Sequence, residues 1–140
     1  MIDRREIGYA QARELVGAVA DRLEADDLGA AVAVVDAHGE LVALLRTDGC
    51  PLPSIKIAIA KAFTAARERK ESRALGDAAR EQDFPLTNFG EIGYVGWGGG
   101  VPLVVNDEVI GAIGISGLPE EEDMKLARWA AGTIGQARAN

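Results

Sequence analysis

Few residues of this chain combine reactive chemistry with a suggestive position, and Lys61 is the first of them. It stands in the run "IKIAIAKAFTAARERK" (residues 55–70), beside small residues such as Ala58 and Ala62 that leave room for a cavity. An ammonium group in such a cavity can move a proton. The alternative is a lysine at the border of an apolar helix face, with its stem buried and its charge in water. The sequence leaves both interpretations open.

Charged and hydroxyl-bearing residues near predicted strand ends supply further candidates. Asp36 ends an apolar run and is a second candidate for proton transfer. Arg46 and Asp48 follow the next run and could orient a carboxylate or propionate, although exposed turn charges are the ordinary alternative. Ser116 lies at a strand-to-helix junction, where helix capping is favoured over phosphate binding because acids crowd residues 120–123.

A glycine-rich segment, "GYVGWGGG" at residues 93–100, precedes the apolar run "VPLVV". It lacks the Lys-Ser/Thr ending of a phosphate-binding loop, and it leads into a strand instead of a helix, which disfavours nucleotide binding. One interpretation is that its glycines have a purely structural role and let two backbone segments pass close to each other. Alternatively, exposed amides and a flat indole ring suit a planar ligand. We predict ligand contacts from Tyr94, Trp97, Gly98, Gly99 and Gly100, besides Arg46, Asp48, Lys61 and Ser116.

His38 is the only histidine, so neither a two-histidine zinc site nor a His–Cys nucleophile pair can be assembled. It falls in a predicted turn, where a solvated side chain is the simplest interpretation, although one histidine can still bind one face of haem. We therefore predict no metal site. The single cysteine, Cys50, cannot form an internal disulfide, so nothing requires an oxidising compartment.

Length and charge narrow the classes of protein further. The 140 residues, 48% of them apolar, are enough for one domain with one core. A net charge of −7 argues against binding to nucleic acid or to an anionic membrane. No apolar window approaches the length of a membrane span, and the first residues lack the apolar centre of a signal peptide. We expect a cytoplasmic protein.

Hydrophobic periodicity and turn residues predict the order of the elements. A helix is expected from Asp3, capped by Asp3 and Glu6, to about Asp26. The other expected elements are a hairpin at 30–36 and 39–46, a helix capped by Ser54, a short helix within 71–89, a short strand at 91–95, a hairpin at 101–105 and 108–116, and a final helix after Pro119. This order predicts an α+β fold in which helices flank an antiparallel sheet of about five strands.

Five short pieces, taken in order, resemble the GlcG/HbpS family, which also occurs as the C-terminal domain of PduO-type proteins. The pieces are Asp36 with Gly39, Arg46 with Asp48 and Gly49, residues 61–65, residues 99–102, and Gly111, Gly114, Ser116 and Gly117. The resemblance covers nearly the whole chain, as a single domain from 1 to 140. It departs from the family at Thr47, where the family usually has methionine.

The resemblance implies an α+β domain, assembly into homo-oligomers and, for some members, binding of haem or a haem-like tetrapyrrole. The chain itself offers few ligands for iron: His38, Cys50, Met124, Tyr9 and Tyr94. Haem is thus an expectation carried by the family and not by these residues.

Three hypotheses of function follow. The first is a small-ligand-binding protein, with haem as a candidate ligand in a pocket between the Lys61 helix and the glycine-rich segment. The second is an isomerase, tautomerase or lyase of small organic acids, in which Lys61 or Asp36 moves a proton and Arg46 holds a carboxylate. The third is a partner subunit without chemistry of its own, because alanine-rich helices also suit oligomerisation.

Overall fold

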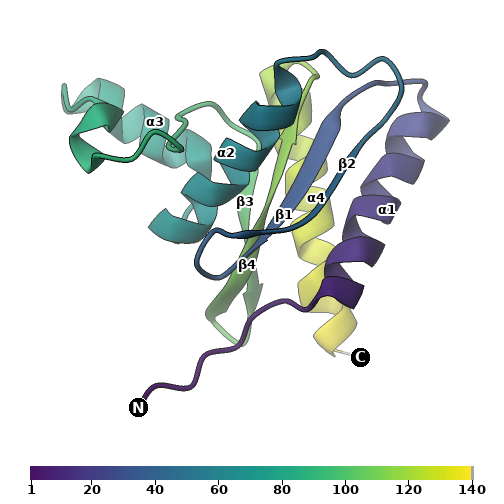
Figure 1. The fold of residues 1–140 in the computed structure, drawn as a ribbon, viewed down its shortest axis with the longest axis horizontal. Helices are drawn as coiled ribbons and strands as arrows, with labels where there is room; N and C mark the ends of the chain where they lie inside the picture. The colour runs from purple at the N-terminus through teal and green to yellow at the C-terminus, as the bar shows by residue number, and fades with distance from the viewer. Residues whose placement is uncertain (140) are drawn as a thin grey trace.

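Four antiparallel strands form one sheet with a layer of helices on each side (Figure 1). The computed structural model describes residues 1–139. The strands lie in the order β2-β1-β4-β3, so the two hairpins meet along β1 and β4 at the centre. The elements are α1 (Tyr9–Ala25), β1 (Ala31–Asp36), β2 (Leu41–Arg46), α2 (Ser54–Glu68), α3 (Ser72–Glu81), the 3-10 helix η1 (Leu86–Phe89), β3 (Gly100–Val105), β4 (Glu108–Ser116) and α4 (Glu120–Ala139).

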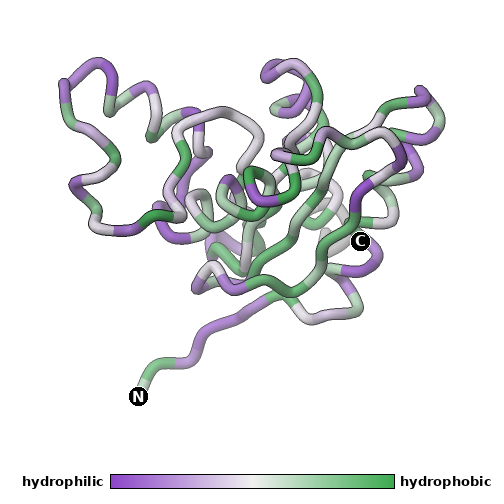
Figure 2. Tube along the Cα trace, turned by 45° about the horizontal axis from the view of Figure 1, so that its top comes forward, coloured by the Kyte–Doolittle hydropathy of each residue, from purple (hydrophilic) through white to green (hydrophobic). Residues whose placement is uncertain are grey.

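The face of the sheet toward α1 and α4 carries the larger apolar side chains. Val32 and Val34 of β1 and Ile113 and Ile115 of β4 are fully buried there, beside Leu23 of α1. Alternate residues along a strand point to opposite faces, so the intervening positions face α2. The strands therefore form the hydrophobic centre of the molecule, as the hydropathy colouring in Figure 2 shows.

The face toward α2 carries mainly alanine and glycine. Ala33 and Ala112 of the sheet pack against Ala58 and Ala62 of α2 in a second buried cluster. At Gly114 an added Cβ would lie 2.1 Å from the carbonyl oxygen of Ala58. Small residues on both sides thus let α2 lie directly against the backbone of β4. Because of this close approach, Lys61 of α2 is buried.

The sheet has four strands, not about five, because residues 91–95 do not form the expected strand. Their backbone is held by a helix and not by a neighbouring strand: the amide of Val95 donates to the Thr64 hydroxyl at 2.9 Å. The α+β class and the flanking helices agree with the prediction.

Two predicted helix caps are wrong. The first helix begins at Tyr9 and not at Asp3, because the preceding chain runs beside β4, with the Ile7 amide donating to the carbonyl of Ile110 at 2.9 Å. Glu6 instead accepts a hydrogen bond from the Ala37 amide. Ser54 is the first residue of α2 and makes no capping hydrogen bond.

No helix among the described residues is sufficiently long and apolar to cross a membrane.

Candidate functional site

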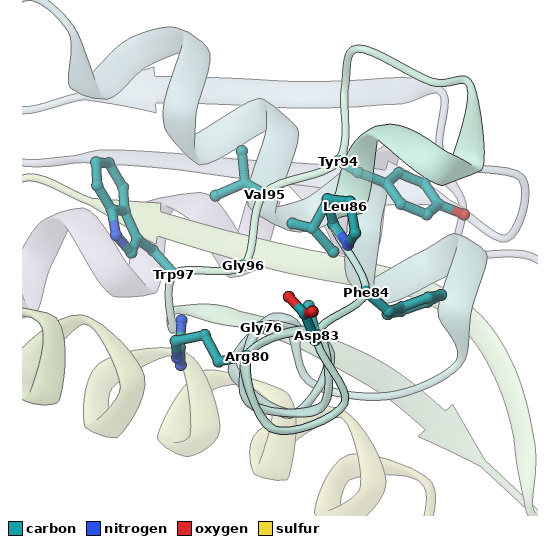
Figure 3. A pocket seen from close by; sticks show the side chains of 11 residues that line it. Gly76, Arg80, Asp83, Phe84, Leu86, Tyr94, Val95, Gly96 and Trp97 are labelled. Carbon is teal, nitrogen blue, oxygen red and sulfur yellow. The ribbon is translucent and has the colours of Figure 1, made fainter.

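Two neighbouring hollows share the indole of Trp97. The first, here called the apolar pocket, has a volume of about 580 Å³ and lies between α3, η1 and residues 94–97 (Figure 3). The second, here called the polar hollow, has a volume of about 330 Å³. Its polar wall residues are Ser54 and Lys61, from the start and the middle of α2, Ser116, from the end of β4, and Glu120 and Asp123, from the start of α4.

Lys61 is buried, with 2% of its surface exposed. Its Nζ donates to the carbonyl oxygen of Ile115 at 2.9 Å and to Oδ2 of Asp123 at 3.1 Å. The interpretation of Lys61 as a border residue with its charge in water is therefore wrong. The interpretation fails because a helical wheel describes one helix by itself. It shows neither the strand under Lys61 nor the helix α4 that covers it.

Asp123 is a site residue that the sequence pattern does not reveal. It is as buried as Lys61, and its Oδ1 accepts a hydrogen bond from the Leu118 amide at 3.1 Å. Burial raises the pKa of the Asp123 carboxyl, and the Lys61 ammonium and two backbone amides partly oppose that rise. In the sequence Asp123 is the last of four acids at the start of a helix, which indicates only an interaction with the helix dipole.

The glycines of the loop are packed against the Lys61 site. Gly99 has φ +125, and an added Cβ would lie 2.5 Å from the carbonyl oxygen of Ile115; at Gly100 it would lie 2.2 Å from that of Lys61. Ser72 holds the loop through its hydroxyl, which donates to the Trp97 carbonyl at 2.7 Å and accepts from the Gly100 amide at 2.9 Å.

These contacts support the alternative of close backbone passage for the three consecutive glycines. The walls of the two hollows include Gly96 but not Gly98, Gly99 or Gly100. Direct ligand contacts from these three residues stay a prediction.

The two aromatic residues of the segment, Tyr94 and Trp97, both line the apolar pocket. Figure 3 shows Trp97 on one side of this pocket and Tyr94 and Phe84 on the other. The indole of Trp97 is 60% exposed, so its ring is accessible. The Tyr94 hydroxyl donates to Oε2 of Glu68 at 2.8 Å, and burial together with this carboxylate raises the pKa of Tyr94 to about 12.

The sheet register gives the positions of Ser116 and Arg46 relative to each other. Ser116 and Arg46 both pair with Ala31, from opposite sides, so they share one row and one face about 10 Å apart. Arg46 and Asp48 are exposed, and Asp48 lines a different surface hollow. The structure thus brings Lys61, Trp97 and Ser116 together and leaves Arg46 and Asp48 at the margin.

Asp36 lies away from this site. It pairs with Gly111, five positions along the ladder from Ser116 and so about 17 Å away. Its Oδ1 accepts hydrogen bonds from the amides of His38 and Glu40, at 2.9 and 3.0 Å, and thereby shapes the hairpin turn. Asp36 therefore does not share a hollow with Lys61, and proton transfer by either residue stays a prediction.

Among the described residues, one group of three could hold a metal ion: Asp36 and His38 of this turn, with Glu6 of the segment before α1. Ligand atoms of Glu6, Asp36 and His38 lie within 4.8 Å of one another. The His38 side chain is 66% exposed, in agreement with its assignment to a turn, and its Nδ1 lies 3.1 Å from Oε1 of Glu6. The cluster is remote from both hollows, at the opposite end of β1.

The described residues thus define a small α+β domain in which two adjoining hollows lie beside α2 and the glycine-rich loop. A family model described as "Haem degrading protein HbpS-like" matches residues 7–132, and the chain belongs to that family.

Relatives and solved structures support this assignment. Protein GlcG of Escherichia coli K12 is 30% identical over 116 residues, which cover 79% of this chain and 81% of GlcG. A crystal structure of a Streptomyces reticuli HbpS double mutant has a TM-score of 0.86 at 26% identity, covering 96% of this chain and 91% of that one. A PduOC:heme complex has a TM-score of 0.83 at 28% identity, covering 92% and 95%.

Proposed function

We propose that this protein binds a flat, haem-type tetrapyrrole in the apolar pocket. The observation that carries the proposal is the wall of this pocket, which has a volume of about 580 Å³ and is lined by the aromatic residues Trp97, Tyr94 and Phe84 together with Leu86. Sites for small ligands and cofactors have this size and this apolar character. The structural relative that was crystallised with heme supports a tetrapyrrole as the ligand.

A cation at the edge of the pocket favours a ligand with carboxylates. Arg80 contributes to the wall and is 59% exposed on its side chain. It pairs with Asp77, but Asp77 also accepts a hydrogen bond from Arg73. A guanidinium group has five N–H donors, so Arg80 keeps donors for a propionate of the ligand.

The pocket fits the macrocycle better than it fits the iron. Among the described residues, its wall contains no histidine, cysteine or methionine. Its one phenol, Tyr94, donates to Glu68 and has a pKa raised to about 12, so the phenolate form that ligates iron is disfavoured near neutral pH. The proposal therefore concerns binding of the ring and its carboxylates, and no reaction at iron is part of it.

The proposal is tested by titrating the protein with haemin and with iron-free protoporphyrin IX while absorbance and tryptophan fluorescence are recorded. We expect both pigments to bind, with dissociation constants within about tenfold of each other, because the ring and not the iron supplies the contacts. Arg80→Ala should weaken both by about tenfold, the loss of one charge-assisted contact.

The matched control is Arg13→Ala, which removes an exposed arginine from α1, on the other side of the sheet. This change should leave both titrations unaltered. Spectra identical to those of the free pigments at the same concentration would rule out the proposed function.

A further inference from the structure

The polar hollow contains hydrogen-bonding groups that the chain itself does not use. Ser54 and Ser116 are 6% and 5% exposed, and neither hydroxyl bonds to another of the described residues. Every described side-chain nitrogen or oxygen that is completely inaccessible has a partner. The two unpartnered hydroxyls are therefore accessible, and the space that they can reach is the hollow which they line.

The carboxylates of the hollow are already engaged. Asp123 accepts from Lys61 Nζ through one oxygen and from the Leu118 amide through the other. Glu120 accepts from the Gly98 amide at 2.6 Å, and its second oxygen lies 3.3 Å from a guanidinium nitrogen of Arg73. Each carboxylate is thus paired with a cation, and both present few free acceptors to a ligand.

The groups that remain free are donors. Lys61 has three N–H bonds as an ammonium ion and uses two of them, on Ile115 and Asp123. The hydroxyls of Ser54 and Ser116 add two more donors. The first turn of α2 adds the positive end of a helix dipole, although its Ser54 and Ile57 amides already donate to the carbonyls of Pro51 and Pro53. A ligand that satisfies this set must present acceptor atoms and negative charge.

We infer that the polar hollow is a second ligand site, for a small carboxylate of a few carbon atoms. Its volume of about 330 Å³ is at the lower end for ligand sites, and Ile57, Leu118 and the indole of Trp97 provide apolar walls for a short carbon chain. The inference is independent of tetrapyrrole binding, since of the residues named for the two hollows only Trp97 belongs to both.

The test is a titration with lactate and acetate, followed by calorimetry and by the fluorescence of Trp97 in a Trp129→Phe background. Inorganic phosphate and glycerol are the comparison probes. We expect the carboxylates to bind at least tenfold more tightly than either, because the free donors match a planar anion and the apolar walls match its chain. Ser54→Ala and Ser116→Ala should each weaken carboxylate binding about fivefold to tenfold.

Thr133→Ala is the matched control, because its hydroxyl lies on α4 and donates to the Ala130 carbonyl instead of lining the hollow. It should leave binding unchanged. Amide chemical shifts of the wild-type protein provide a second measurement that needs no variant, and they should change at residues 54–57 and 116–118.

Equal binding of glycerol or phosphate, carboxylate affinity that survives both serine changes, or shifts that map elsewhere would each overturn the inference. Haemin titrations of Ser116→Ala keep the two proposals distinguishable. If tetrapyrroles do not bind but carboxylate binding depends on the serines, only the proposed function is contradicted. If tetrapyrroles bind but carboxylate binding does not depend on the serines, only the second site is contradicted.

Discussion

At the scale of single residues, the Lys61–Asp123 pair removes two charges from water. The two side chains are 3% and 4% exposed and lie 3.1 Å apart. Such a pair adds little net stability, since removing two charges from water costs about as much as their attraction returns. Breaking the pair is different, because the remaining partner keeps its burial and loses its counter-charge.

Asp123→Ala should therefore lower the free energy of unfolding by about 3 kcal/mol or more, measured by urea denaturation at neutral pH. The double change Lys61→Met with Asp123→Leu should recover most of that loss, because no unpaired charge remains. Glu122→Ala, which removes a surface partner of Lys125 at 3.6 Å, should change stability by less than about 1 kcal/mol. Equal losses in the single and double variants would contradict this account.

At the scale of elements, the contact between α2 and β4 controls where the site lies. Gly114 faces α2, and an added Cβ would meet the Ala58 carbonyl at 2.1 Å and the Ala62 amide at 2.6 Å. Neither backbone atom can move without shifting the helix. The glycine thus fixes the distance between helix and sheet, and with it the position of Lys61 relative to Ile115.

Gly114→Ala should destabilise the protein by about 3 kcal/mol, at the upper end for overpacking, because backbone and not a flexible side chain blocks the methyl group. Gly17→Ala is the contrasting change, since nothing lies within 4 Å of its added Cβ inside α1. It should stabilise the protein by about 0.5 to 1 kcal/mol through helix propensity. Thermal unfolding of the two variants would measure the difference, and similar shifts in both would refute the close-packing argument.

At the scale of the whole molecule, β2 offers an apolar surface to another chain. It is an edge strand, α2 lies mainly over β4 and β1, and Leu41 and Leu44 are 46% and 40% exposed. An uncovered apolar edge strand is a common surface for self-association. We therefore expect the homo-oligomer that the family resemblance implies to use this edge.

Sedimentation velocity over a range of concentrations should detect a species larger than the monomer, and Leu44→Lys should shift it toward the monomer by adding a charge to the interface. Ile92→Lys, at a fully exposed loop position, should have no such effect. A wild-type protein that stays monomeric at every concentration would exclude this interface.

The sequence predicts local structure well and the site only in part. Both hairpins follow from apolar runs and from turn residues such as Asn106 and Asp107, whose φ angles are positive as the turn requires. The extra strand at residues 91–95 is wrong because an apolar run does not reveal that its backbone will bond to the Thr64 hydroxyl.

The sequence by itself determined the order of the main helices, the two hairpins and the family, because hydrophobic period, turn chemistry and short motifs are properties of neighbouring residues. Only the tertiary structure decided that Asp123 would meet Lys61 and that Asp36 would not. That choice depends on pairing β1 with β4 and on seating α2 against Gly114, contacts between segments far apart in the chain. The physical reason is that burial and charge pairing act through space, and no local pattern of residue types specifies them.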